Sequence, residues 1–320
     1  MVAVKKSICH FNSFFTSCNP LNVRTNTQIW VNDGVRTDIR RKGHGLQRAL
    51  TFALIKVVSD KLKRLREKED SEESKGRTAS KSTYFIIEEP ELYLHPQAQR
   101  ALFDSLVSLS ESKKQVLLCT HASALIDVEK YSSICIVKKD NDAEGTKICQ
   151  FTGELFVGDS KKSFNLSYWL NPDRSELFFA KKVVLVEGPT EKTIIPLLAK
   201  KMDIFKYEIT IVDCGSKTAI PLYARLLNKF SIPYVAVYDQ DHQAHKDRQA
   251  LNAANRDTHL VEVEINADLG KSIVFFNDIE EELGLPDGNK SKPYIALSHV
   301  SNAGFTLTPQ LKSKIREIYE

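Results

Sequence analysis

From residue 183 onward, short apolar strands alternate with helical segments, and this alternation restricts the fold more than any other feature of the sequence. Strands are predicted at residues 183–186, 209–212 and 234–238, and helices at 190–202 and 217–230 lie between them. Short buried strands that are joined by helices form parallel sheets covered on both faces. The pattern therefore predicts an α/β domain in the second half of the chain.

The first half shows a second α/β pattern. Apolar runs predict strands at residues 84–87, 115–119 and 133–137, and a helix begins at Pro96. Apolar residues at 48–66 recur at helical spacing, and the charged stretch that follows, 67–82, is interpreted as a surface loop. The chain is thus predicted to hold two domains, a number that its 320 residues allow.

Composition and charge exclude several classes. No apolar run is long enough to cross a membrane, and the opening residues are too polar for a signal peptide. The six cysteines form no CxxC pair, so we expect reduced thiols in a cytoplasmic protein without zinc. Residues 36–82 hold 14 Lys and Arg against 7 Asp and Glu. This basic excess could contact a phosphate backbone, or it could be a solvated helix face.

Acidic residues follow two of the predicted strands in the second half. Glu187 precedes a glycine at the end of the first strand, Glu191 lies one helical turn further on, and Asp239 and Asp241 follow the third strand. Because parallel strands end at one edge of the sheet, Glu187, Asp239 and Asp241 should converge. Carboxylates that converge repel one another unless they are neutralised, and hard oxygen ligands select Mg²⁺ or Mn²⁺. The alternative is that these acids are solvated ends of strands.

A different group of motifs lies in the first half. The strand at 84–87 ends in Glu88 and Glu89, a pair that could hold Mg²⁺ and orient a water molecule. Upstream stands Gly43-His-Gly-Leu-Gln-Arg48, and Thr120-His121 follows the next strand. Along the chain, the motifs at 43–48, 88–89 and 120–121 resemble the signature, Walker B and switch motifs of ABC-type ATPases, in the order that these enzymes have.

That resemblance implies roles for individual residues. Glu89 would be the catalytic glutamate that orients water, and Glu88 would be the Mg²⁺ ligand. Gly43, Gly45 and Gln47 would contact ATP bound by a partner subunit, and His121 would sense the γ-phosphate of ATP. A P-loop is not found, because Gly270-Lys271-Ser272 has Ile265 where the first glycine should stand. We therefore expect ATP to bind only with a complementing nucleotide-binding lobe, and we expect no ATP hydrolysis by this chain alone.

The second half resembles the Toprim domain, and the whole arrangement is similar to the OLD (overcoming lysogenization defect) family and the related Gabija-type nucleases. The likeness rests on residues 43–48, 88–96, 120–121, 174–180, 187–191 and 239–241. It implies part of an ABC-type ATPase domain over 1–160, a connector over 161–180 and a Toprim nuclease domain over 181–320.

The resemblance also implies a DNA endonuclease that depends on Mg²⁺ or Mn²⁺. The metal ligands would be Glu187, Glu191, Asp239, Asp241 and Glu280, with Glu282 as the second choice for the last position. Water would attack phosphorus in line while Lys292 stabilises the developing charge. Gly215-Ser216 would border the site, whereas His242 and His245 are left out of it.

Partners and alternatives follow from the same motifs. Because ABC signatures act on a partner's ATP, a homodimer is expected, and a separate chain could supply the missing lobe or act as a helicase. The main alternative is a regulatory or DNA-clamping ATPase fragment with a vestigial nuclease domain. A Toprim strand-passage or priming enzyme is the third possibility, but no separate domain is present that would carry an active-site tyrosine.

Overall fold

The structure, a computed structural model, describes residues 28–54, 57, 83–111, 114–139, 145–155, 172–285 and 292–320. Most of the predicted helix beyond residue 54, the predicted loop at 67–82 and residues 161–171 of the predicted connector lie outside these ranges. The chain divides into two compact units at Leu125 and Ile126, and each is described by itself.

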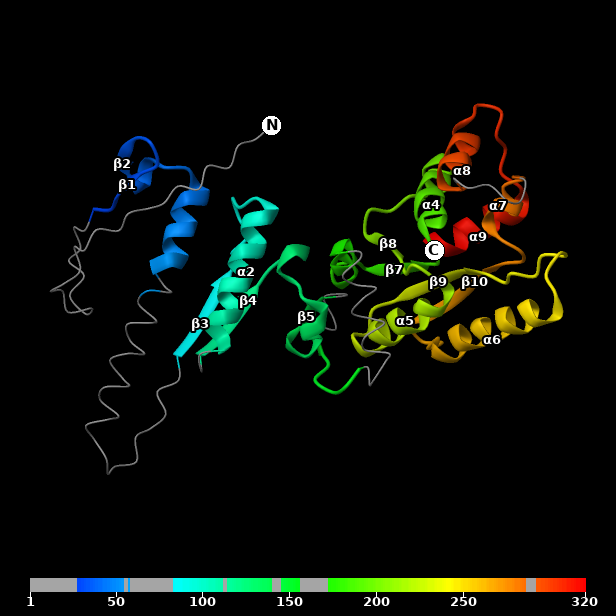
Figure 1. The fold of residues 1–320 in the computed structure, drawn as a ribbon, viewed down its shortest axis with the longest axis horizontal. Helices are drawn as coiled ribbons and strands as arrows, with labels where there is room; N and C mark the ends of the chain where they lie inside the picture. Colours follow the sequence, from blue (N-terminus) through cyan, green and yellow to red (C-terminus); the bar gives the residue numbers. More distant parts are fainter. Residues whose placement is uncertain are drawn as a thin grey trace, which may run out of the picture. The chain divides into compact units, whose positions relative to one another are not determined.

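The first unit contains a parallel strand pair packed on a helix (Figure 1). Buried Leu102, Leu106 and Leu109 of the helix pack against alternate strand residues such as Phe85 and Val116. Residues 44–54 form a further helix. The other described elements of this unit are β1 (Trp30–Asn32), β2 (Arg36–Asp38), η1 (Ile39–Arg41), β3 (Thr83–Glu88), α2 (Pro96–Glu111), β4 (Lys114–Cys119) and η2 (Ser123–Leu125).

The second unit is built on a four-stranded parallel sheet. The strands are β7 (Lys182–Val186), β8 (Ile209–Asp213), β9 (Tyr234–Asp239) and β10 (Gly270–Phe275), in the order β10-β9-β7-β8. All three pairings are parallel, so every strand ends at the same edge. The predicted strands are confirmed, and β10 is a fourth strand that the sequence analysis did not include.

Helices cover both faces of this sheet, as predicted (Figure 1). Alternate residues of β7 point to opposite cores: Val183 and Leu185 to one, Val184 and Val186 to the other. The first face is covered by α5 (Ile220–Lys229) and α6 (Arg248–Glu264), and the second by α4 (Pro189–Lys201), α8 (Lys292–Ser301) and α9 (Pro309–Tyr319).

Smaller elements complete the second unit. The described ones are η3 (Val128–Ser133), β5 (Cys135–Lys138), β6 (Lys147–Gln150), η4 (Pro172–Phe178), η5 (Lys217–Ala219) and α7 (Ile279–Glu282). The antiparallel pair of β5 and β6 starts two residues later than the predicted strand. The predicted domain boundaries at 160 and 180 stay predictions. No helix in the described part of the chain is long and apolar enough to cross a bilayer.

Gly270 is required where β10 begins beside β9. It pairs directly with Tyr234, and a methyl group at Gly270 would lie 2.6 Å from Cε2 of that buried ring. We expect Gly270→Ala to lower the free energy of unfolding by about 1–3 kcal/mol, because the core must shift to admit the methyl group. Urea denaturation followed by circular dichroism measures this loss.

Gly304→Ala is the matched control. Its added methyl would meet only Asn302 Oδ1, at an ordinary 3.8 Å, so little change is expected. Equal stabilities of the two variants would contradict the register of β9 and β10.

Candidate functional site

The acids predicted to converge do meet at the carboxyl edge of the main sheet. Glu187 directly follows β7, Asp239 ends the neighbouring strand β9, and Asp241 lies two residues further on. The side chain of Glu187 accepts a hydrogen bond at 2.7 Å from the backbone N–H of Asp239. The two strand ends are thus joined through one carboxylate.

Burial makes these carboxylates hold protons unusually tightly. It raises the pKa of Glu187 to about 7, against the hydrogen bond from Asp239 and the nearby Lys217, which lower it. Burial, reinforced by repulsion from Glu191, Glu187, Asp241 and Asp278, raises the pKa of Asp239 to about 9. At neutral pH, Asp239 therefore carries a proton in the chain without metal.

Glu191 is fixed by the start of α4. It is only 5% exposed, and its carboxylate accepts a hydrogen bond at 3.2 Å from the backbone N–H of Gly188. This contact caps the helix, which gives Glu191 a structural role besides any ligand role. Burial raises its pKa, and the nearby charge of Glu280 raises it further.

Asp241 is held by two lysines. It has a left-handed backbone (φ 65°), and its carboxylate forms ion pairs with Lys246 at 3.0 Å and Lys217 at 3.5 Å. Lys217 is 6% exposed, donates to the backbone carbonyl of Asp239 and lies over the ring of Tyr238. Its burial and its contacts make it part of the site.

Sequence reasoning did not include Lys217. The available signal was its place directly after Gly215-Ser216, a loop that was expected to border the site. A single lysine at the start of a helix gave no further indication of burial.

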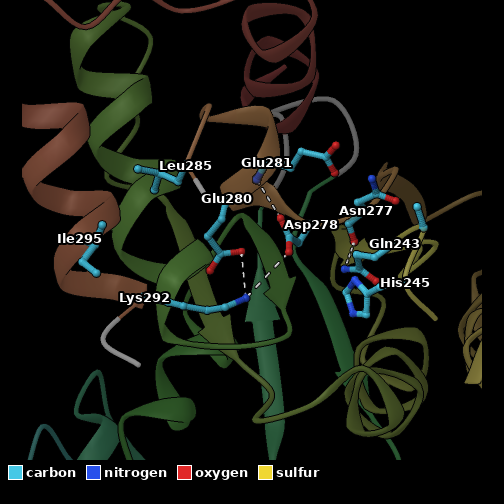
Figure 2. Close-up of a pocket in the computed structure, with 10 residues that line it drawn as sticks. Gln243, His245, Asn277, Asp278, Glu280, Glu281, Leu285, Lys292 and Ile295 are labelled. Atoms are coloured by element: carbon cyan, nitrogen blue, oxygen red, sulfur yellow. Dashed lines mark hydrogen bonds and ion pairs between the residues drawn. The ribbon is translucent and has the colours of Figure 1, made fainter. Parts of the chain in front are cut away.

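The later acid and the lysine also lie together. Lys292 forms ion pairs with Glu280 at 3.5 Å and with Asp278 at 3.8 Å (Figure 2). Although burial alone lowers it, the two carboxylates raise the pKa of Lys292. The second-choice acid, Glu282, is bound instead by Lys314. The structure therefore places Glu280, and not Glu282, beside Lys292.

The fit of a divalent metal ion rests on the donor set. Among the residues that the structure describes, no three histidine, cysteine, aspartate or glutamate side chains are already arranged as a metal-binding group. However, Oδ1 of Asp239 is buried without a hydrogen-bond partner, and such an acceptor needs a cation or a proton. Hard carboxylate oxygens around it suit Mg²⁺ or Mn²⁺. The assignment of the individual ligands stays a prediction.

A cavity of 410 Å³ borders this edge. The loop after β9 and the segment after β10 form much of its wall, and the residues that line it are Gln243, Ala244, His245, Asn277, Asp278, Glu280, Glu281, Leu285, Lys292 and Ile295 (Figure 2). Sequence reasoning named only Glu280 and Lys292 as members of a site and set His245 aside. Side-chain amides such as those of Gln243 and Asn277 are common on surfaces and gave no signal.

The ATPase-like motifs of the first unit also meet. Glu88 ends β3, and Glu89 (φ 42°) follows it and donates its backbone N–H to the carbonyl of Cys119 at 2.8 Å. The carbonyl of Glu89 accepts from Arg48 at 3.1 Å, and the backbone N–H of His121 donates to Glu91 at 2.8 Å. These contacts bring the three predicted motifs together, while the roles in nucleotide binding stay predictions.

Two residues of the signature-like motif, Gly45 and Gln47, have structural roles of their own. A methyl group at Gly45 would lie 2.9 Å from the carbonyl oxygen of Tyr93, so only glycine permits this approach, whereas Gly43 has open space around it. The side chain of Gln47 donates to the carbonyl of Lys42 at 2.7 Å and closes the turn before the helix.

Both parts of the chain match models of known domain families. Residues 178–241 match the model described as "Overcoming lysogenization defect protein-like, TOPRIM domain", and residues 3–126 match the "AAA ATPase domain". These matches, together with the sheet, confirm the predicted fold class.

Several relatives share the sequence over a long stretch. The Old nuclease of Escherichia phage P2 is 32% identical over an alignment of 242 residues, which covers 71% of this chain and 39% of that protein. The OLD nuclease of Thermus scotoductus is 28% identical over 65% of this chain and 42% of its own length. Endonuclease GajA of Bacillus cereus strain HuB5-5 is 24% identical over 53% of this chain and 28% of its own length. The chain spans about two fifths of the first two relatives.

The raised pKa values predict how stability depends on pH. Asp239 binds its proton more tightly when folded than when unfolded, so its contribution to stability is full below about pH 4 and falls as pH rises toward 9. The slope is at most about 1.4 kcal/mol per pH unit. We expect Asp239→Asn to stabilise the chain in EDTA more at pH 8.5 than at pH 5, as measured by urea denaturation. Asp268→Asn, at an exposed position, is the control, and an equal gain at both pH values would contradict the assignment.

Lys217 generates a second prediction. We expect Lys217→Met to lower the free energy of unfolding by about 1–3 kcal/mol, because the carbonyl of Asp239 and the carboxylate of Asp241 both lose a buried partner. Lys181→Met is the control, since Lys181 is 78% exposed in its ion pair with Glu208 and should change stability by no more than about 0.5 kcal/mol. Similar losses in the two variants would show that Lys217 is not a buried support of the site.

Proposed function

We propose that this chain, which carries an OLD-like Toprim domain and an AAA-type ATPase region, is a DNA endonuclease that depends on Mg²⁺ or Mn²⁺. The observation that carries the proposal is the meeting of Glu187, Asp239 and Asp241 at one sheet edge, with an oxygen of Asp239 buried and unpartnered. The nuclease names of the relatives support the same reaction class.

The metal would be held by Glu187, Asp239 and Asp241, with Glu191 and Glu280 as the remaining candidates. When bound, a divalent ion supplies a Lewis acid that polarises the phosphate and activates water. The protein's own part is to keep the carboxylates together. Lys217 offsets their repulsion, while the hydrogen bond from Asp239 orients Glu187.

Lys292 would stabilise negative charge on the phosphate. Its ammonium group is held by Asp278 and Glu280 from the segment after β10, so its position is set before the substrate arrives. Because the Lys292 side chain is 43% exposed, a phosphate can reach its ammonium group. An ammonium group placed in advance stabilises developing charge without reorganisation.

The ATPase region would regulate cutting and would not power it alone. The residues proposed to contact nucleotide are Gly43, Gly45, Gln47, Glu88, Glu89 and His121. ATP would bind there with a complementing lobe, in a homodimer or with a second chain such as a helicase.

A regulatory protein with an inactive nuclease site is the second candidate. The ion pairs of Asp241 with Lys217 and Lys246 favour it, because both ammonium groups occupy a carboxylate that the metal would need. Cutting by the native chain would rule this candidate out.

The test is a plasmid assay. We expect the native chain to nick or linearise supercoiled DNA with Mn²⁺ or Mg²⁺ and without ATP, and we expect Asp239→Asn to lower the rate about a hundredfold or more. Even partners outside the ligand set typically change metal affinity or activity by about 10- to 100-fold. Asp268→Asn removes the same charge at an exposed position and should leave the rate unchanged. If a folded native chain cuts no faster than Asp239→Asn, the nuclease proposal fails.

A further inference from the structure

The 410 Å³ cavity beside the carboxylates has one wall rich in amides and another that is apolar. Gln243, Asn277 and His245 lie together at one end, Leu285 and Ile295 lie at the other, and Lys292 stands between them (Figure 2). Cavities of a few hundred cubic ångströms are typical of sites for small organic groups, which are oriented by polar side chains at fixed places. The volume is enough for one nucleic-acid base.

Two oxygens at the amide end have no hydrogen-bond partner. These are Oε1 of Gln243 and Oδ1 of Asn277, and both are buried. The nitrogen of the Gln243 amide donates to the backbone carbonyl of Asn277 at 3.4 Å, which makes its oxygen the unpaired atom. A buried acceptor without a donor costs free energy, so a donor that enters the cavity and draws these side chains toward it would be favoured.

The charges of the lining exclude an anion as the main occupant. Asp278, Glu280 and Glu281 are acidic, and Lys292 shares its single positive charge between the first two through ion pairs. What the lining offers is therefore a surplus of acceptors. A neutral group that carries N–H donors fits this surplus, whereas a phosphate at the same place would be repelled.

We propose that this cavity binds one unstacked base of the DNA strand that is cut, and that it prefers bases with an exocyclic amino group. Adenine, cytosine and guanine each present an amino group, and thymine presents a carbonyl oxygen and a methyl group instead. The inference rests on the proposed nuclease function, and it names Gln243 and Asn277 as the residues that determine the preference.

The backbone places this base next to the metal ligands. The carbonyl of Asn277 accepts both the amide of Gln243 and the backbone N–H of Asp241, the latter at 3.2 Å. Asp278 and Glu280 belong to the cavity wall, and their charges raise the pKa values of Asp239 and Glu191. A base in the cavity would therefore flank the phosphate at the carboxylates. Such a base must leave the stack, which requires a single strand or a locally opened duplex.

The test compares two ligands of the same shape. Fluorescein-labelled strands of ten thymidines and of ten 5-methylcytidines are titrated with the native chain in Ca²⁺, and binding is followed by anisotropy. The two bases share the methyl group and the ring, and they differ in the amino group that replaces a carbonyl. We expect the 5-methylcytidine strand to bind on the order of tenfold more tightly, as a well-placed contact to a base edge provides. Gln243→Leu and Asn277→Leu should reduce this ratio toward one.

Gln249→Leu, at an exposed position of α6, is the matched control and should keep the full ratio. Thermal unfolding of each variant shows that it is folded, and the ratio for the native chain needs no variant at all. Equal affinities for the two strands, no binding of either, or a ratio that survives both cavity variants would overturn the inference.

The plasmid assay separates this failure from failure of the nuclease proposal. Cutting by the native chain together with equal affinities would remove only the base preference. A preference that depends on Gln243, without any cutting, would remove the nuclease and keep the base site.

Discussion

The burial of several carboxylates at one edge of the sheet is the constraint on which the site in the second unit depends. The parallel order of β7 and β9 brings Glu187 and Asp239 to one edge, where burial and mutual repulsion disfavour their charged forms. Three features offset this free-energy cost when no metal is bound: protons on the acids, the hydrogen bond between the strand ends, and the buried ammonium group of Lys217. The arrangement that is costly without a cation would favour the binding of one.

The surrounding fold keeps this edge from relaxing. The strands are buried on both faces by two separate cores, so β7 cannot slide without moving helices on each side. The cap that Glu191 forms on α4 attaches a further acid to a rigid element. Asp241 lies beyond the end of β9 with a left-handed backbone, and its loop is held by two lysines and by the carbonyl of Asn277.

The sequence predicted those parts of the fold that follow simple periodicity. Three strands of the main sheet and the meeting of Glu187, Asp239 and Asp241 could be derived because uninterrupted apolar strands imply a parallel sheet whose ends coincide. The fourth strand, β10, begins with Gly270, Lys271 and Ser272, whose polarity hides its place in the sheet.

Other features depend on contacts that no local pattern encodes. The ammonium group of Lys217 is held by the carbonyl of Asp239 at the end of β9, and Lys314 holds Glu282 while Lys292 pairs with Glu280. The cavity forms because the loop after β9 lies opposite the segment after β10. These segments are far apart in the sequence, so the spacing of apolar residues could not predict their meeting. Whether the carboxylates and Lys292 perform the assigned chemistry stays a prediction.

The carbonyl of Asn277 has a consequence for the energetics of the two neighbouring sites. It accepts hydrogen bonds from the loop of Asp241 and from the amide of Gln243, so both sites share one anchoring atom. Any ligand that fixes this atom removes conformational freedom that the second ligand would otherwise have to remove. If the two proposed ligands bind, occupancy of the cavity and of the carboxylates would therefore be thermodynamically linked, and each ligand would change the affinity of the other by the same factor.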